Sequence, residues 1–316
     1  MNTLKWLMQR EFWEHKGAFL WTPAIVGGAL VSLAGGTLLY KSMSGGQHSG
    51  ALVHMSEGGA PPDKLADILS VAYMALAGPV FLMMALAMFF YAASCLYDER
   101  RDRSILFWKS LPVSDGMTVL SKALSALVVM PVLSFAAATL SAFLMVPIVC
   151  TALAMHGVNI TGRVFSTPAL YIAPLQLLSM LPVFIIWALP TLGWLMLVSS
   201  WARSKALLWA VGLPLLAIAT LKMLDASLGL GFDVNLVIRS GILRALAGFV
   251  PGIWFLYDNE TMQGMAEVVR DQGPSLGLVA QHAWRTLATP AAWGGALAGL
   301  AMLAGAVRLR RYRDDT

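Results

Sequence analysis

The chain has 316 residues, of which 58% are hydrophobic and only 12% carry a charge, and its formal net charge is +5. Soluble domains are about 25% charged, so this chain has too few charged residues to cover the surface of a water-soluble fold. The composition therefore excludes an ordinary soluble domain and predicts an all-α integral membrane protein.

Six stretches of the sequence are long and charge-poor enough to form transmembrane helices, each of which needs about 20 apolar residues. They cover residues 18–40, 68–96, 119–150, 171–200, 206–221 and 289–307. The fifth stretch is short, but no charge interrupts it between Lys205 and Lys222. We therefore expect residues 1–316 to form a single transmembrane domain with six spans.

The N-terminal segment, MNTLKWLMQREFWEHKGAFLW, does not resemble a signal peptide, because its charges continue to Lys16 and no clear cleavage site follows. In the first span, Gly28, Ser32 and Gly36 recur every four residues. Small residues at this spacing allow two helices to approach closely. They predict a helix-packing face, either within the subunit or between two subunits.

The distribution of basic residues predicts the side of the membrane on which each loop lies. With six spans both termini share one side, and that side holds 14 of the 22 basic residues together with 8 acidic ones. The other side holds 8 basic and 9 acidic residues. Because Lys and Arg are concentrated in cytoplasmic loops, we expect both termini to lie in the cytoplasm.

The long segment 223–288 is predicted to be an external insertion that contains short helices. Its uncharged part, Ala245–Tyr257, has 13 residues and contains Pro251, so it is too short to span a bilayer. Trp254, Phe255 and Tyr257 are expected to rest at the membrane interface, where aromatic side chains gather.

The loop between the second and third spans is the most densely charged part of the sequence. Residues 94–117, SCLYDERRDRSILFWKSLPVSDGM, carry eight charges among 24 residues. A single charge at the bilayer centre costs about 2.5–3.5 kcal/mol, so this stretch is predicted to lie in the cytoplasm. Acidic residues do not contribute to membrane orientation, and their mixture with arginines favours a docking surface for a partner.

The spacing within this loop predicts a short amphipathic helix against the inner face of the membrane. Glu99 and Arg103 stand four residues apart, in the order that favours a helical ion pair. An apolar face follows at three-residue steps, and a proline then ends the helix. These residues are Ile105, Trp108, Leu111 and Pro112.

The segment LYDERRDRSILFWKSLPVSDGMTVLSKAL resembles the loop between the second and third spans of ABC-2-type transporter permeases. Glu99, the LPVS run at 111–114 and Lys122 match the pattern of that family, whereas Arg103-Ser104 and Ser121 replace its usual Gly-Thr and Gly. The six spans and the external insertion before the last span also fit. So does the N-terminal stretch LKWLMQREFWEHK, which corresponds to an amphipathic helix on the cytoplasmic face.

The resemblance implies a permease that works with a separate ATPase. In that family the loop is a coupling helix that docks on the ATPase, and two permeases and two ATPases form the working unit. It therefore implies two copies of an ABC ATPase, a second permease chain as a homodimer or heterodimer, contact with membrane lipid, and export across a bacterial inner membrane. The implied ATPase-coupling residues are Asp98, Glu99, Arg100, Arg101, Arg103, Ile105, Trp108, Leu111 and Pro112.

The chain itself is not expected to be an enzyme. It has no GxxxxGK[ST] phosphate-binding loop, so ATP and Mg are expected on the partner ATPase, and no cofactor, metal or nucleic acid is expected on this chain. Two alternatives remain open. An ATP-independent channel or secondary carrier would need an ionisable residue inside a span. An intramembrane hydrolase would need carboxylates, histidines or a Ser/His pair facing a cavity, and the five histidines fall in loops or at span ends.

Overall fold

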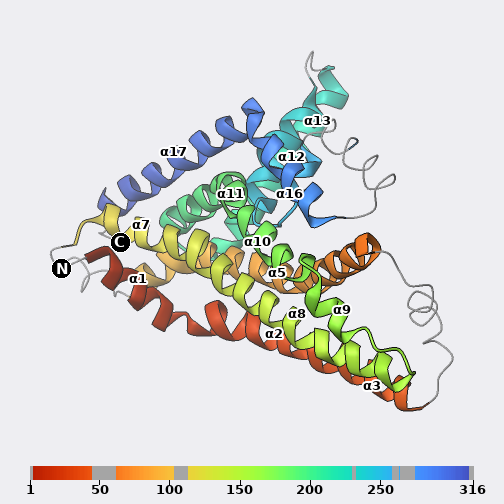
Figure 1. Ribbon diagram of the computed structural model, residues 1–316. Coiled ribbons are helices and arrows are strands. Elements are labelled where there is room, and N and C mark those ends of the chain that lie inside the picture. The colour runs from red at the N-terminus through yellow and green to blue at the C-terminus, as the bar shows by residue number, and fades with distance from the viewer. Residues whose placement is uncertain are drawn as a thin grey trace.

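The computed structural model describes residues 3–44, 62–102, 113–229, 233–257, 263 and 275–312. Within these ranges the chain is helical and contains no β-strand (Figure 1). Five of the predicted coupling residues lie outside the described residues: Arg103, Ile105, Trp108, Leu111 and Pro112.

Within the part of the chain that the structure describes, six helical segments are long and apolar enough to cross a membrane, which agrees with the predicted number of spans. Three of these spans join several consecutive helices, and each of the other three is formed by one helix. The first joins η1 (Gly17–Trp21), α2 (Thr22–Leu30), η2 (Val31–Gly35) and α3 (Gly36–Met43); the second is α5 (Pro62–Arg101); the third joins α7 (Asp115–Leu124), η4 (Ser125–Val129) and α8 (Met130–Met155); the fourth joins α10 (Ala169–Ser179) and α11 (Leu181–Trp201); the fifth is α12 (Ala206–Leu228); and the sixth is α17 (Pro290–Tyr312).

The fifth span is longer than the sequence predicts. Helix α12 continues beyond the predicted end at residue 221, through Lys222 and Asp225, to Leu228. It stops where Gly229 adopts a left-handed conformation with φ of 60°, which residues other than glycine rarely adopt. The charged residues therefore belong to the last turns of this helix rather than to the insertion.

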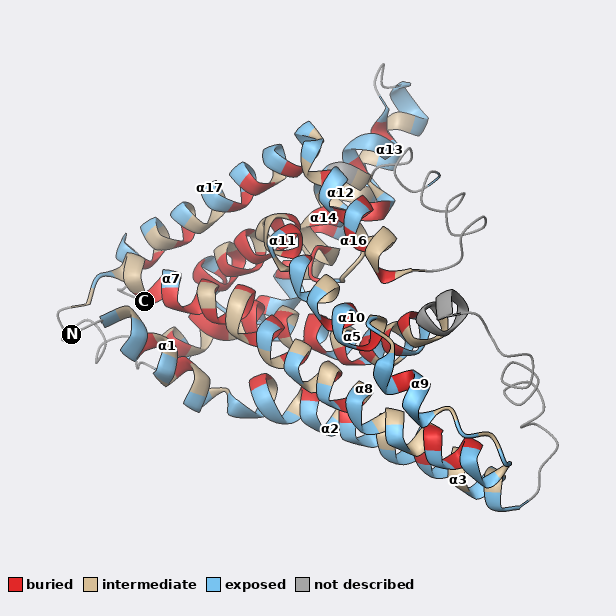
Figure 2. Ribbon diagram, in the orientation of Figure 1, coloured by how far each residue is buried: buried red, intermediate tan, exposed pale blue. Residues whose placement is uncertain are grey.

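Helix α11 lies at the centre of the bundle. It is the most buried span, it packs against α17 on one side and α5 on another, and α5 in turn packs against α8 (Figure 2). The first span lies against α8 at the edge of the bundle, and α12 is the least buried span. Trp187, Leu192, Leu195 and Met196 of α11 are almost completely buried.

Glycines allow α11 and α17 to approach with their backbones in contact. A Cβ atom added to Gly193 of α11 would lie 2.9 Å from the Cα of Gly299 in α17. A Cβ atom on Gly299 would in turn lie 2.8 Å from the backbone nitrogen of Pro190. Neither position has room for a side chain, so these two glycines set the distance between the central helix and the last span.

Within the segment 223–288, which is predicted to be an external insertion, the described residues form short helices, and part of the segment packs back into the bundle. Its helices are α13 (Val234–Val237), η5 (Ile238–Leu243), α14 (Arg244–Ala247), η6 (Ile253–Leu256) and α16 (Leu276–Arg285). The hydroxyl of Thr191 in α11 donates to the carbonyl oxygen of Arg244 over 2.7 Å and accepts from the backbone N–H of Gly248 over 2.9 Å. Thr191 lies ten residues before Trp201, about 15 Å along the helix axis, so α14 reaches the middle of α11.

The aromatic residues after α14 are placed differently from the sequence prediction. Trp254 and Phe255 are buried inside the protein rather than lying at its surface. The turn at Pro251 and Gly252, where Gly252 has φ of 84°, directs them inward. Tyr257 stacks on Trp187 with ring centroids 5.4 Å apart. The contacts of α14 with α11 explain the difference, because they hold this segment among the helices.

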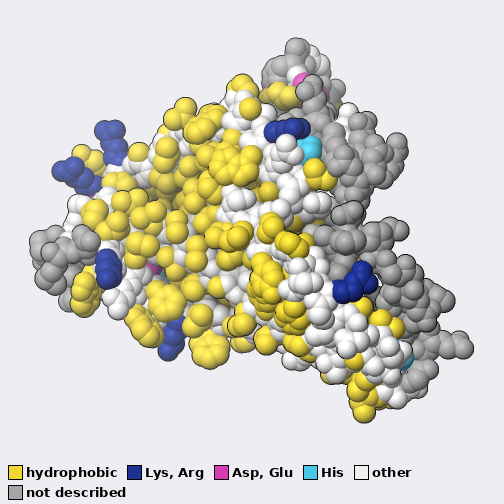
Figure 3. All heavy atoms as spheres, in the orientation of Figure 1, with side chains coloured by type: hydrophobic (Ala, Val, Ile, Leu, Met, Phe, Trp, Pro, Cys, Tyr) yellow, Lys and Arg dark blue, Asp and Glu magenta, His cyan; other side chains and the backbone are white. Residues whose placement is uncertain are grey.

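The outer surface has the character of a membrane protein. On the face drawn in Figure 3, hydrophobic side chains cover the middle of the molecule, and Lys and Arg side chains lie towards its margins. Many large apolar side chains of the spans are exposed, among them Ile25, Leu33, Leu140, Leu216 and Leu297. Such a surface is stable only in an apolar surrounding, so the chain is a multi-pass integral membrane protein.

Candidate functional site: a buried ionic network

Five charged side chains from four helices meet at the end of the bundle where α1 (Thr3–Glu14) and the last turns of α17 lie (Figure 1). We call Glu11, Glu99, Asp115, Lys122 and Arg310 the ionic network. Lys122 Nζ lies 2.7 Å from Glu11 Oε1 and 3.1 Å from Glu99 Oε1. Arg310 bridges two carboxylates, with Nη1 2.5 Å from Glu99 Oε2 and Nε 3.1 Å from Asp115 Oδ1.

Four of the five members of the ionic network are buried, Asp115 is half-buried, and the charges are nearly balanced. Glu11 and Lys122 are each 1% exposed, and Arg310 is 4% exposed. Arg10 adds a further positive charge, since its Nη2 lies 3.9 Å from Glu99 Oε1. The hydroxyl of Tyr91 donates to Glu11 Oε2 over 2.8 Å. Glu11 and Glu99 thus each have cationic partners, without which their burial would be strongly unfavourable.

Local sequence features bring the members of the ionic network together. Ser114 caps α7 by accepting a hydrogen bond from the N–H of Met117, which starts this helix at Asp115. Asp115 and Lys122 are seven residues apart, two helical turns, so both lie on the same face of α7. Helix α5 continues through Arg101, five residues beyond the apolar stretch that ends at residue 96, and this extension brings Glu99 to Lys122.

A second contact fastens the end of α5 to the end of α11. Arg100 Nη2 donates to the carbonyl oxygens of Ser199 and Ala202 over 2.6 and 2.9 Å. The hydroxyl oxygen of Ser199 accepts from the backbone N–H groups of Leu96 and Tyr97 over 3.1 and 2.9 Å. The last turn of α5 is therefore joined directly to the central helix of the bundle.

The predicted coupling residues that the structure describes divide into two groups. Glu99 and Arg100 have the intramolecular partners given above, whereas Arg101 is exposed and Asp98 is half-buried. The sequence analysis did not identify Glu11, Asp115 or Arg310 as site residues, and it used Lys122 only as a family match. They were visible in the sequence as charged residues at the edges of apolar spans, but their partners are up to 211 positions away along the chain.

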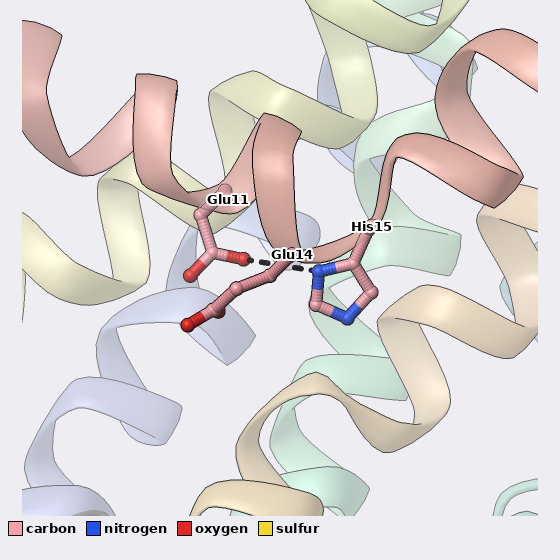
Figure 4. A group of neighbouring side chains, drawn as sticks. All are labelled: Glu11, Glu14 and His15. Carbon is pink, nitrogen blue, oxygen red and sulfur yellow. Dashed lines mark ion pairs between the residues drawn. The ribbon is translucent and has the colours of Figure 1, made fainter.

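Glu11, Glu14 and His15 form a group whose possible metal-ligand atoms all lie within 4.8 Å of one another (Figure 4). His15 Nδ1 lies 3.9 Å from Glu11 Oε2, the ion pair drawn in Figure 4. Both oxygens of Glu11 already have partners, Lys122 and Tyr91. A neighbouring ammonium group opposes a metal cation, so we interpret this group as part of the surroundings of the ionic network.

The predicted packing face of the first span points outward. Gly28, Ser32 and Gly36 are exposed, and no atom lies within 4 Å of a Cβ added to either glycine. Within the subunit, the first span packs through Gly27 and Gly35 instead, and a Cβ atom added to Gly35 would lie 3.0 Å from Ile148 Cδ1 of α8. The alternative of packing between two subunits through Gly28, Ser32 and Gly36 stays a prediction.

Among the described residues, one further buried cation lies apart from the ionic network. Arg244 is 3% exposed, and its guanidinium carbon is 4.1 Å from the ring centroid of Trp187. The guanidinium donates to the carbonyl oxygens of Ala291 and Ala292 at the start of α17, the latter over 3.1 Å. Burial lowers the pKa of Arg244 to about 10, so this side chain remains protonated at neutral pH.

Comparison with known proteins gives no relative from which a function can be transferred. No family model matches the chain, and neither a curated protein nor a solved structure matches it. The functional argument therefore rests on the residues and geometry described above.

Proposed function

We propose that this chain is the membrane-spanning permease subunit of an ABC-2-type transporter, an exporter in a bacterial inner membrane that is driven by a separate ATPase. The resemblance of the segment between the second and third spans supports this proposal, as does the multi-pass helical fold. ATP and Mg would bind to the ATPase, and two permease chains would pair in the membrane.

The ionic network is the observation that carries the proposal. A transporter of this kind needs a rigid connection between the loop that meets the ATPase and the helices that move. Glu99 stands three residues after Leu96, at the end of α5 that leads into residues 103–112, and it is joined to Lys122 of α7 and Arg310 of α17. Lys122 also binds Glu11 of α1. A displacement of the loop would therefore move four helices together.

Docking on the ATPase and transmission to the spans can be separated by mutation. Arg101 is exposed at the end of α5, and we expect Arg101→Glu to weaken association with the ATPase through charge repulsion. Glu99 is buried in the ionic network, and we expect Glu99→Gln to preserve association but to uncouple ATP hydrolysis from transport. The measurement is purification of the tagged chain from its native membrane, with quantification of any co-purifying P-loop ATPase and its hydrolysis rate.

Arg203 provides a matched control for Arg101, because it is also exposed and basic but lies in the next loop at the same end of the bundle. Arg203→Glu is expected to retain more of the ATPase than Arg101→Glu. Purification of the native chain without any P-loop ATPase, together with substrate flux that continues after ATP depletion, would reject the proposal.

Arg244 supports a second candidate function, an ATP-independent carrier or channel. A buried cation packed between α11 and α17 is the kind of ionisable group that binds a coupling ion or an anionic substrate in such proteins. Flux into ATP-free vesicles that contain only this chain would favour this candidate. Loss of that flux in Arg244→Met would assign it to the guanidinium group.

A further inference from the structure

The side of α1 that points away from the bundle carries tryptophan and lysine side chains. We define the outward face of α1 as Lys5, Trp6, Gln9 and Trp13, together with Lys16 just beyond the helix; all five are exposed. Trp6 and Trp13 are seven residues apart, two helical turns, so they lie on one side of the helix. They are 67% and 60% exposed. Two large, exposed aromatic side chains on one side of a helix indicate a contact outside the subunit.

The opposite side of α1 holds the helix against the bundle. Leu7 and Glu11 are 6% and 1% exposed, and Glu11 binds Lys122 of α7. Helix α1 packs along α7 and the η4 turn that follows it. Because the ion pair with Lys122 fixes the rotation of α1 about its axis, the outward face is presented to the surroundings of the bundle.

Helix α1 lies at the level where the hydrocarbon core of the bilayer gives way to headgroups. The first membrane-crossing segment begins at Gly17, three residues after the end of α1. The segment that begins with α7 has 41 residues, about 60 Å of helix, whereas the hydrocarbon core is about 30 Å thick. The first turns of α7 carry Asp115 and Lys122, and charges avoid the bilayer centre. These turns, and α1 beside them, therefore lie in the headgroup region.

The outward face of α1 is positively charged. Lys5 and Lys16 are exposed, while the exposed carboxylate of Glu14 is paired with Arg10, whose Nε lies 2.8 Å from Glu14 Oε1. Lysine side chains bury their methylene groups in apolar surroundings and keep the ammonium group at the level of lipid phosphates. Tryptophan is enriched at the same level. Lysine and tryptophan together on an exposed helix face are typical of helices that bind anionic membranes.

We propose that the outward face of α1 binds anionic phospholipids of the leaflet at the end of the bundle that carries the ionic network. Lys5 and Lys16 bind lipid phosphate groups, and Trp6 and Trp13 lie among the headgroups and the first methylene groups of the chains. The two lysines are 11 residues apart, about 16 Å along the helix, so they reach separate lipid molecules. This surface does not depend on the proposed transport function.

Photolabelling of the full chain tests this surface. The chain is reconstituted in phosphatidylcholine vesicles that contain a minor fraction of phosphatidylglycerol. A trace of either lipid carries a diazirine next to the glycerol backbone, and adducts on residues 5–16 are quantified by mass spectrometry. We expect the phosphatidylglycerol probe to label these residues at least about fivefold more than the phosphatidylcholine probe, and the ratio to fall at high salt. Equal labelling by the two probes would overturn the proposal.

Charge removal identifies the lysines as the cause. Lys5→Gln/Lys16→Gln should lower the ratio of phosphatidylglycerol to phosphatidylcholine adducts on residues 5–16 to about one, since the attraction to anionic headgroups is lost. Lys41→Gln/Arg285→Gln is the matched control, because it removes two exposed cations at the other end of the bundle and should preserve the ratio. An unchanged ratio in Lys5→Gln/Lys16→Gln with a native unfolding midpoint would contradict the proposal.

Two further outcomes separate the lipid from a protein occupant. Trp6→Ala/Trp13→Ala should lower labelling of residues 5–16 by both probes, because the tryptophans hold this face among the headgroups. If Lys5→Gln/Lys16→Gln instead loses a protein that co-purifies with the native chain while the lipid ratio stays the same, the outward face binds that protein, and the lipid proposal is wrong.

Discussion

At the scale of single residues, the ionic network shows how a membrane protein keeps charges away from water and lipid. Each of its two most buried carboxylates has a cation within 3.1 Å, and Lys122 serves both of them. A buried carboxylate without its cationic partner destabilises the fold far more than a carboxylate exposed to water. The contribution of each member is therefore best measured by removing one charge and asking whether removal of its partner restores stability.

Lys122→Met is expected to destabilise the protein by about 3–5 kcal/mol, because it leaves Glu11 and Glu99 facing each other without their shared cation. The measurement is thermal or denaturant unfolding in detergent. The control is Lys41→Met, at an exposed position near the other end of the first span, which should change stability little. The double variant Glu11→Gln/Lys122→Met should be less destabilised than the sum of its single changes, and strict additivity would contradict the coupling.

At the scale of helices, the contact between α11 and α17 depends on the absence of side chains. Gly193 and Gly299 meet with their backbones in contact, and a methyl group at either position has no room unless the helices separate. Gly294 lies on the same helix as Gly299, but no atom lies within 4 Å of a Cβ added there. The two positions of α17 therefore form a natural pair for comparison.

Gly299→Ala is expected to destabilise the protein by about 1–3 kcal/mol, the usual cost of overpacking a tight contact. Gly294→Ala should be neutral or slightly stabilising, since alanine favours helix formation and meets nothing. Unfolding midpoints of the two variants in the same detergent provide the measurement. Equal midpoints would show that the two helices are not in close contact.

Helix-scale features also show where sequence patterns lose their predictive value. The four-residue spacing of Gly28, Ser32 and Gly36 is typical of a packing face, yet Gly27 and Gly35 make the contacts within the subunit. The π-helical turn at Val31–Gly35 has a wider turn than an α-helix and changes which side chains lie in line. A regular spacing rule cannot anticipate such a turn from sequence alone.

At the scale of the whole molecule, the number of spans was predictable because it depends on local hydrophobicity and length. The ionic network was not, because its partners come from opposite ends of the chain and only the packing of α1, α7 and α17 brings them together. The packing of α14 into the bundle was not predicted either. Its apolar run is too short to be recognised as a span, and the helix is too short to be recognised as a surface helix.

The orientation of the molecule in the membrane is tested by cysteine labelling in intact cells. If the end with the ionic network faces the cytoplasm, Asp102→Cys should be protected from a membrane-impermeant maleimide, and Ser44→Cys should react. The two native cysteines, Cys95 and Cys150, are buried and should give little background. Lysed cells serve as the control, in which both introduced cysteines should react. Labelling of Asp102→Cys before lysis would reverse the proposed topology.

The order in which the ribosome delivers the ionic network has a consequence for biosynthesis. Glu11, Glu99, Asp115 and Lys122 emerge first, and Arg310 follows Lys122 by 188 residues. Until the sixth span inserts, the three carboxylates face only Lys122 and the more distant Arg10, and Asp115 lacks its partner Arg310. A chain truncated before residue 290 is therefore expected to be less stable at this end of the bundle than the chain with α17, because Glu99 and Asp115 then lack Arg310.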